Sequence, residues 1–415
     1  MMSSTGKSRG SRYYSTAGAL VAFLAVAGCA TTTTYPDVDI SKQRMETYLQ
    51  NKPLQLRPLY SKVLLQGDRN LVLNHMQAGL ASMELGRNDL AEESFERALV
   101  GIERTYANSE TARKARSTWY EEGMKNFKGE PYERAMAYYY RGLAYFRQGD
   151  FQNARACFKG GVLQDAFAEE KQNRCDFGLL IFLEGWASQC DGDLRLAQTA
   201  YDEVKGLRPD FVPPGKDHNV LVIAETGTAP RKVSDGIGHY QLKYRRGRHF
   251  TEQSARVRAG RRNVEMYPME DIAWQAMTRG GRQVDSIIKG QVKFKQRNEK
   301  IATVLTDVSA TAMLFAPVFK NQGEISAASG ALGLVGVAFW AISAKVKPRA
   351  DIRYWNNLPD AVHVFTFKAP EQDQTVSVDF LDGNGVEIGS KQGNVHFVKG
   401  YGLGWIRSRS AIVIE

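Results

Sequence analysis

The sequence is poor in the residues that most often carry enzyme chemistry. It has four cysteines and six histidines in 415 residues. No serine lies in a G-x-S-x-G turn, and no glycine-rich phosphate loop is present. The histidines show no metal-ligand spacing such as H-E-x-x-H; they are His75, His218, His239, His249, His363 and His396. We therefore expect no enzyme activity, no cofactor and no bound metal.

One cluster of charges stands out within the sequence GEPYER. Glu130, Glu133 and Arg134 lie together beside Pro131. Acidic residues and proline are both typical of the first turn of a helix, where they match the unpaired N–H groups and the helix dipole. We interpret the cluster as the start of a helix and assign it no catalytic role.

The first cysteine follows a short apolar run. Basic residues precede the uncharged stretch 13–34, whose apolar centre is about a dozen residues long and too short for a convincing membrane span. The sequence Val-Ala-Gly-Cys that ends at Cys29 resembles the lipobox of bacterial lipoproteins, in which the chain is cut before the cysteine and the sulfur is acylated. The alternative is a secreted protein with a chance cysteine at this position.

The lipobox resemblance implies a signal peptide over 1–28 and a lipid-anchored, Thr-rich tether over 29–45. Ala30 follows the cysteine, and in lipoproteins a residue other than Asp there favours sorting to the outer membrane. The expected location is therefore the outer membrane, with the chain facing the periplasm.

Export would place the other cysteines in an oxidising compartment, where disulfides persist. Because Cys157, Cys175 and Cys190 are odd in number, at most one pair can form. Cys157 and Cys175 lie symmetrically about residue 166, where we expect a turn between helices, so they could face each other. Alternatively, they are small buried apolar residues.

One spacing of small and aromatic residues occurs three times. A glycine is followed at offsets of 7, 12 and 16 by a glycine, an alanine and an aromatic residue. The three sets are Gly79, Gly86, Ala91 and Phe95; Gly142, Gly149, Ala154 and Phe158; and Gly185, Gly192, Ala197 and Tyr201. The pattern predicts pairs of antiparallel helices that approach closely, with the second glycine ending the first helix and the aromatic residue wedged between successive pairs.

This pattern resembles the tetratricopeptide repeat, a helix-turn-helix unit of about 34 residues. The resemblance implies a helical array over 46–212. The copies are unevenly spaced, and an extra helix is expected within 106–130.

The inner face of such an array would be wholly apolar. The positions that a tetratricopeptide groove would present are Leu73, Met76, Leu80, Met83, Met136, Tyr139, Leu143, Phe146, Leu179, Phe182 and Trp186. Two interpretations stay open. The face is either core, covered by the extra helix or by the C-terminal half, or a groove for an apolar or amphipathic helix of a partner.

The region 213–300 is strongly basic and is expected to be a linker with a strand and a helix. Within it, residues 231–300 contain 17 Lys or Arg and 7 Asp or Glu. The main arginines are Arg245, Arg246, Arg248, Arg256, Arg258, Arg261 and Arg262. Export argues against nucleic acid, which leaves anionic lipid headgroups, cell-wall polymers, an acidic partner, or simply a solvated surface.

The last third changes character twice. Residues 301–346 are expected to form an apolar helical hairpin, and its uncharged run 325–344 can either be buried or enter a membrane. Residues 347–415 alternate apolar and polar positions, which predicts a small antiparallel β domain that could recruit 220–224. The expected fold class is multidomain α+β, with the helical array first.

Four stretches, GEPYERAMAYYYRGLAYFRQGDF, ETGTAPRK, RQVDSIIKGQVKFK and ADIRYWNNLP, are similar to a family of bacterial tetratricopeptide-containing outer-membrane lipoproteins. The resemblance implies no catalytic residues. The expected function is a lipid-anchored periplasmic scaffold or assembly protein that binds another envelope protein through its groove. The alternatives are a membrane-inserting protein that uses 325–344 and a binder of anionic polymers that uses the basic region.

Acylation of Cys29 is directly testable. In cells fed a fatty-acid analogue, the wild-type protein should incorporate the label and Cys29→Ser should not, because no other residue has the lipobox context. Unchanged labelling of the variant would contradict the assignment. Recovery of the protein from the inner membrane alone would contradict the sorting expected from Ala30.

Overall fold

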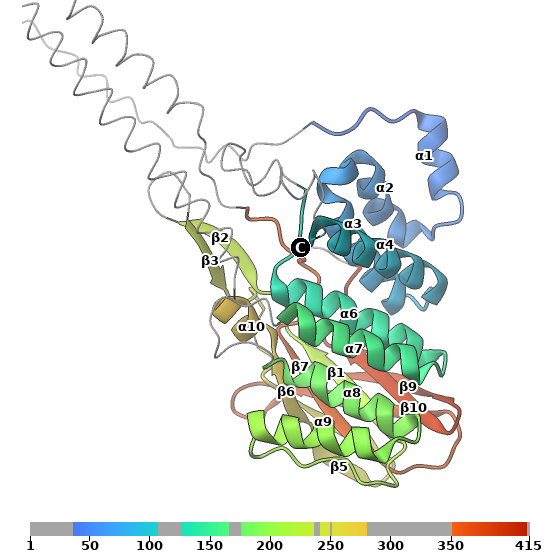
Figure 1. Cartoon of the computed structure of the whole chain (residues 1–415), viewed down its shortest axis with the longest axis vertical. Helices are drawn as coiled ribbons and strands as arrows, with labels where there is room; N and C mark the ends of the chain where they lie inside the picture. Colours follow the sequence, from blue (N-terminus) through green and yellow to red (C-terminus); the bar gives the residue numbers. More distant parts are fainter. Residues whose placement is uncertain are drawn as a thin grey trace, which may run out of the picture. The chain divides into compact units, whose positions relative to one another are not determined.

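The computed structural model of the protein describes residues 36–106, 126–165, 176–235, 241–249, 251–279 and 351–412. The chain divides into two compact units, Met1–Pro36 and Asp37–Glu415, and every element described below belongs to the second. The fold is α+β, with helices in the N-terminal part and a sheet formed mainly from the C-terminal part, as the sequence predicts (Figure 1). The predicted signal peptide, Cys29, the apolar hairpin 301–346 and most of the predicted extra helix lie outside the described residues.

The helices form three antiparallel pairs at the predicted positions, α3–α4, α6–α7 and α8–α9 (Figure 1). The array begins slightly earlier than predicted, because α1 starts inside the expected tether. The helices are α1 (Lys42–Leu49), the short 3-10 helix η1 (Leu54–Leu56), α2 (Arg57–Leu65), α3 (Gly67–Glu84), α4 (Asn88–Tyr106), α6 (Pro131–Arg147), α7 (Phe151–Asp165), α8 (Gly178–Cys190) and α9 (Leu194–Leu207).

The turn inside each pair has the same construction. The second glycine of each repeat has a positive φ: 74° at Gly86, 72° at Gly149 and 86° at Gly192. This left-handed conformation ends the first helix at little steric cost, and the next N–H group bonds back to the carbonyl five residues earlier. Asp150 and Asp193 then cap the second helix by accepting from the N–H groups three residues on.

The aromatic residue of each repeat packs on the first glycine of its own helix pair. A Cβ atom at Gly142 would lie 2.3 Å from the Phe158 ring. The predicted wedge between successive pairs also occurs, since the Phe95 ring stacks on Tyr140 of the next pair with 5.7 Å between ring centroids. The spacing of 16 residues therefore marks a contact within each helix pair, and at Phe95 it also marks a contact between pairs.

The strands form one eight-stranded sheet within the described residues, ordered β5-β4-β8-β9-β10-β1-β7-β6. They are β1 (Val220–Thr226), β4 (Ser254–Ala259), β5 (Arg262–Glu265), β6 (Tyr267–Asp271), β7 (Ala361–Phe367), β8 (Gln374–Leu381), β9 (Glu387–Val398) and β10 (Tyr401–Arg407).

The predicted division into a basic linker and a separate antiparallel domain is wrong, because strands from both regions share this sheet. As anticipated, β1 is recruited, but it pairs in parallel with β10 and antiparallel with β7. All seven residues of β1 are buried. A strand that is apolar on both faces needs cover on both faces, which only a central position provides.

The two faces of β1 belong to two different cores. Leu221 and Ile223 lie in a core shared with the helices, whereas Val220, Val222 and Ala224 lie in a second core among the strands. The sheet bends around this second core: β5 and β6, its two edges, are separated along the chain by Met266 alone, and β4 also contacts β1 and β7.

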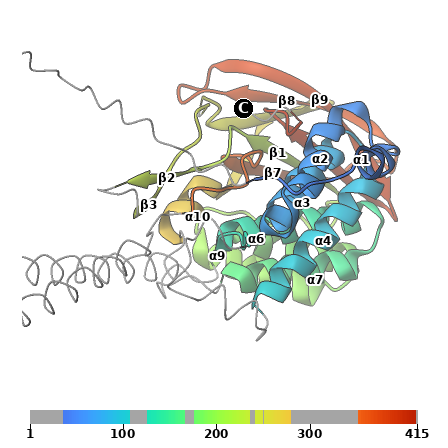
Figure 2. The same ribbon diagram turned by 90° about the horizontal axis from the view of Figure 1, so that it is seen from above.

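Two further elements lie beside this assembly. Strands β2 (Arg231–Asp235) and β3 (Gln241–Arg245) form their own two-stranded hairpin, and helix α10 (Ile272–Arg279) contacts it (Figures 1 and 2). Among the described residues, no helix has both the length and the apolar character needed to cross a membrane.

Replacing Phe158 by Ala should destabilise the protein, because the side chain is fully buried against Gly142. Truncation of a buried phenylalanine typically costs about 3 to 5 kcal/mol. The measurement is the free energy of unfolding from a denaturant titration, and an unchanged value would contradict the repeat assignment.

A matched pair of glycine variants provides the control. Gly142→Ala should also destabilise, since the added methyl group meets the Phe158 ring. Gly206→Ala in α9 should be neutral or stabilising by up to about 1 kcal/mol, because nothing lies within 4 Å of the new atom and alanine favours helix.

Candidate functional site

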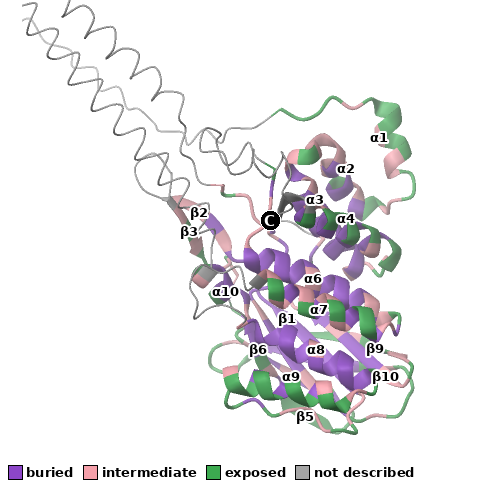
Figure 3. Ribbon diagram, in the orientation of Figure 1, coloured by how far each residue is buried: buried purple, intermediate pink, exposed green. Residues whose placement is uncertain are grey.

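The predicted partner groove is filled by the chain's own sheet, so in this structure it is core and not an open binding surface. All eleven predicted groove residues are buried, with at most 7% of any side chain exposed: Leu73, Met76, Leu80, Met83, Met136, Tyr139, Leu143, Phe146, Leu179, Phe182 and Trp186. They join one core with strand residues such as Leu221 and Leu403. Figure 3 shows that α6 and α8 are largely buried where they lie over the sheet. The apolar inner face of the array packs against the face of the sheet that carries Leu221 and Leu403, and both surfaces are removed from water.

A buried glutamate lies at the centre of this contact. The hydroxyl groups of Tyr139 and Tyr140 donate to the two carboxylate oxygens of Glu225 on β1, each at 3.0 Å. The indole of Trp405 donates to the same carboxylate at 2.8 Å, and Arg407 forms an ion pair with it. Burial raises the pKa of Glu225, while Arg407 and these donors oppose the rise. The inner face of the repeats thus binds an acidic side chain that the chain itself supplies.

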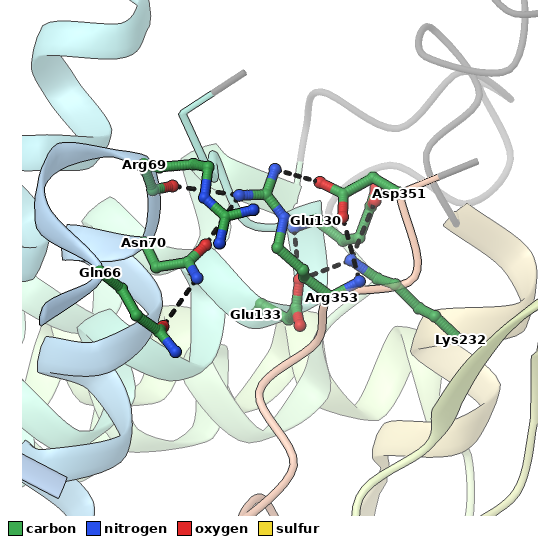
Figure 4. A network of polar contacts seen from close by, with 8 residues as sticks. All are labelled: Gln66, Arg69, Asn70, Glu130, Glu133, Lys232, Asp351 and Arg353. Atoms are coloured by element: carbon green, nitrogen blue, oxygen red, sulfur yellow. Dashed lines mark hydrogen bonds and ion pairs between the residues drawn. The ribbon is translucent and has the colours of Figure 1, made fainter. Parts of the chain in front are cut away.

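A second polar network joins the repeats to β2 and to the segment that begins at residue 351 (Figure 4). Lys232 is buried between Glu130 and Glu133, with its ammonium nitrogen 3.1 Å from each carboxylate. The other oxygen of Glu133 accepts the backbone N–H of Trp355 at 2.7 Å. Burial lowers the pKa of Lys232, but Glu130, Glu133 and Asp351 together raise it by more, so the lysine stays charged.

Arg353 extends this network to the first repeat. It pairs with Asp351 and donates to the side chain of Asn70 and the backbone carbonyl of Arg69 (Figure 4). Asn70 in turn donates to Gln66. The network therefore holds together α3, α6, β2 and the start of the C-terminal segment.

Interpreting the GEPYER charges as the start of a helix is correct but incomplete. Glu130 and Glu133 form a capping box at the start of α6. Their pairing with Lys232, 99 positions after Glu133, has no local signal in the sequence. A buried lysine is rare unless it is paired, but burial cannot be read from its position in a basic region.

Comparison with protein families agrees with the helix pairs. Models of the tetratricopeptide repeat match residues 74–99, within α3 and α4, and 135–162, within α6 and α7. The chain contains tetratricopeptide repeats. The α8–α9 pair has the same glycine spacing and turn but lies outside both matches. No curated protein and no solved structure matches the chain. Tetratricopeptide repeats are modules of protein–protein interaction, so a protein partner is implied.

The predicted basic patch is divided between two places in the structure. Arg245, Arg246 and Arg248 lie on or just after β3, whereas the other members, Arg256, Arg258, Arg261 and Arg262, lie on the β4–β5 hairpin. Several of these side chains serve internal contacts. Arg246 bridges Asp271 and Asp360, Arg258 pairs with Asp379, and Arg262 lies over the Phe367 ring at 5.0 Å.

An open groove lies at the N-terminal end of the helical array. It lies along α1 and α2, has a volume of about 490 Å³ and is lined by Ser41, Gln43, Arg44, Thr47, Tyr48 and Leu64. Helix α1 has no buried residue and is capped by Ser41, which accepts from the backbone N–H of Arg44. Unlike the inner face of the repeats, this groove is not filled by the sheet.

The cysteines and histidines of the described region offer no metal site. Within the described residues, no group of three or more His, Cys, Asp or Glu could hold a metal ion. Cys157 and Cys190 are free thiols, and burial raises the pKa of Cys157 to about 11. Cys175, the other half of the predicted disulfide, lies outside the described residues.

Glu270 is a third buried carboxylate, at the junction of β6 and α8. It accepts from the backbone N–H of Leu179 and the side chain of Gln275, and it pairs with Arg208. Burial raises the pKa of Glu270 from 4.5 to about 7, more than Arg208 lowers it. Between about pH 4.5 and 7, Glu270 is therefore protonated in the folded protein and ionised in the unfolded chain.

This proton predicts a pH dependence of stability. Between about pH 4.5 and 7 the free energy of unfolding should fall as pH rises, by on the order of 3 kcal/mol from Glu270 alone. Glu270→Gln removes this contribution. The free energy of unfolding of the variant should therefore rise relative to that of the wild type as pH rises through this window.

Denaturant titrations at about pH 5 and about pH 8 measure the difference. Glu265→Gln on β5 replaces an exposed glutamate and should leave the pH dependence of wild type unchanged. Parallel stability curves for wild type and Glu270→Gln would show that Glu270 is ionised throughout the window.

Proposed function

We propose that this protein is a lipid-anchored scaffold of the bacterial cell envelope. It holds another envelope protein near the outer membrane, with its own folded part in the periplasm. The tetratricopeptide repeats support the protein–protein interaction, and the lipobox-like sequence at Cys29 supports the anchor. No role in catalysis is proposed, since the charged clusters described above all have structural partners.

The partner is expected to bind at the groove of α1 and α2, which replaces the inner face of the repeats as the candidate binding surface. The observation that carries this assignment is the contrast between the two surfaces: the inner face is buried under the sheet, whereas α1 has no buried residue and faces a groove of about 490 Å³. Tyr48 and Leu64 offer apolar contact, and Gln43, Arg44 and Thr47 offer hydrogen bonds. This mixture suits a folded or extended protein segment.

The groove can be tested by adding charge to its wall. Gln43→Glu with Thr47→Glu places two carboxylates on the exposed side of α1, where substitutions usually change stability by less than about 0.5 kcal/mol. Mild crosslinking in intact cells, followed by purification of the mature protein, should recover a partner with the wild type and lose it with this variant.

A matched control adds the same charge elsewhere. Ala156 on α7 and Thr199 on α9 are exposed on the outer helices of the array, so Ala156→Glu with Thr199→Glu should retain the partner. If both variants retained it, the groove would not be the binding site. If even the wild type captured no envelope protein, the scaffold function would be wrong.

A further inference from the structure

The β2–β3 hairpin stands apart from the eight-stranded sheet (Figures 1 and 2). An isolated two-stranded hairpin is at best marginally stable in water. This one is held at its base, where Lys232 is buried between Glu130 and Glu133 and the Tyr244 ring meets Tyr132 edge-on at 6.2 Å. The hairpin is thus fixed firmly to the repeats while it projects from them.

The hairpin concentrates positive charge. The stretch 241–249, QLKYRRGRH, contains four Lys or Arg and no acidic residue. Arg246 pairs with Asp271 and Asp360. The side chains of Lys243, Arg245 and Arg248 are exposed to solvent. These basic side chains repel one another, and each would be attracted to an anionic surface.

Helix α10 lies against β3 and adds an apolar component. Ile272 and Ala276 are buried beneath it, whereas Trp274 is 53% exposed and Met277 is 44% exposed. Residues three apart lie on the same side of a helix, so Trp274 and Met277 form one apolar surface. Tryptophan beside basic residues is typical of proteins that lie at the boundary between lipid headgroups and acyl chains.

The described chain stops and resumes close to this surface. α10 ends at Arg279, and the next described residue is Asp351, which contributes to the electrostatic environment of Lys232 on β2 (Figure 4). The sequence between them includes the uncharged run 325–344, of a length that can just reach across a bilayer. The described chain therefore stops at the end of α10 and resumes near Lys232 at the base of the hairpin.

We propose that Lys243, Arg245, Arg248, Trp274 and Met277 form a membrane-docking surface for anionic lipid headgroups. The arginines and the lysine contact the phosphates, and Trp274 and Met277 enter the headgroup region. An anionic cell-wall polymer or an acidic protein would match the charges but would leave the apolar pair on α10 unexplained. The inference does not rest on the proposed partner site, which lies on α1 and α2.

The test uses the full-length chain with Cys29→Ser, so that an acyl group cannot bind the vesicles. Sedimentation with vesicles of phosphatidylcholine alone is compared with vesicles of phosphatidylcholine and phosphatidylglycerol. Each basic residue near an anionic surface contributes about 1 kcal/mol, so Arg245→Gln with Arg248→Gln should weaken binding to the anionic vesicles on the order of 30-fold. Added salt should weaken wild-type binding steeply, and Trp274→Ala should weaken binding to anionic vesicles at low salt.

The matched control removes the same charge from α9. Arg195 and Lys205 are exposed there, so Arg195→Gln with Lys205→Gln should bind anionic vesicles as the wild type does. Equal losses in both double variants would show a general effect of net charge and overturn the proposal. Equal wild-type binding to both kinds of vesicle, or to neither, would also overturn it.

Two further results separate this surface from its alternatives. If the hairpin variant kept its affinity for vesicles but lost a crosslinked protein, the surface would bind an acidic protein and the lipid assignment would be wrong. If it lost vesicle binding and kept the crosslinked partner of the wild type, the docking surface would be supported independently of the scaffold function. Circular dichroism of each variant should match wild type, because the substituted arginines are exposed.

Discussion

Burial of the repeat array's inner face against strand β1 is the contact on which the rest of the structure depends. β1 is covered by the helices on one face and by the other strands on the opposite face, so its five buried apolar residues link the two cores. The array cannot present this face to another molecule without exposing Leu221 and Ile223. Protein recognition by these repeats must therefore use surfaces other than the one from which tetratricopeptide binding is usually expected.

Buried charges fix how the helices and the sheet meet. Glu225 and Lys232 each lose their hydration on folding, and each regains several partners from elements distant in sequence. Such pairs often add little net stability, because the desolvation penalty is large. Their geometric requirements are strict, however, since a shift of β1 along the helices would leave a charge buried and unpaired. We regard them as determinants of register more than of stability.

The sequence predicted the local features well, because their causes are local. The glycine and aromatic spacing identified all three helix pairs and the glycine that ends the first helix of each. The apolar inner face was also recognised, with self-coverage as one of two interpretations. The spacing could not decide between them, because the same leucines and tyrosines can bury against any apolar surface.

The sequence anticipated that 220–224 joins the C-terminal strands, but the strand order and the polar networks could not be predicted, since their partners are far apart in the chain. Nothing near Val220 indicates that it pairs with Gly402, and nothing near Glu133 indicates Lys232. The basic region looked continuous in sequence, yet β3 and β4 carry it to two separate sheets. The α1–α2 groove was missed because α1 is weakly apolar and begins within the stretch that resembled a tether.

The parallel pairing of β1 with β10 has a consequence for how the chain folds. The two strands are separated by more than 170 residues, since Val220 pairs with Gly402. Closing so large a loop costs entropy before the contact repays it, and such long-range pairing slows folding. Until β10 pairs with β1, one edge of β1 has no neighbouring strand and the apolar side chains around it are exposed to water. The helical repeats are synthesised first, but their shared core is complete only when β10 pairs with β1.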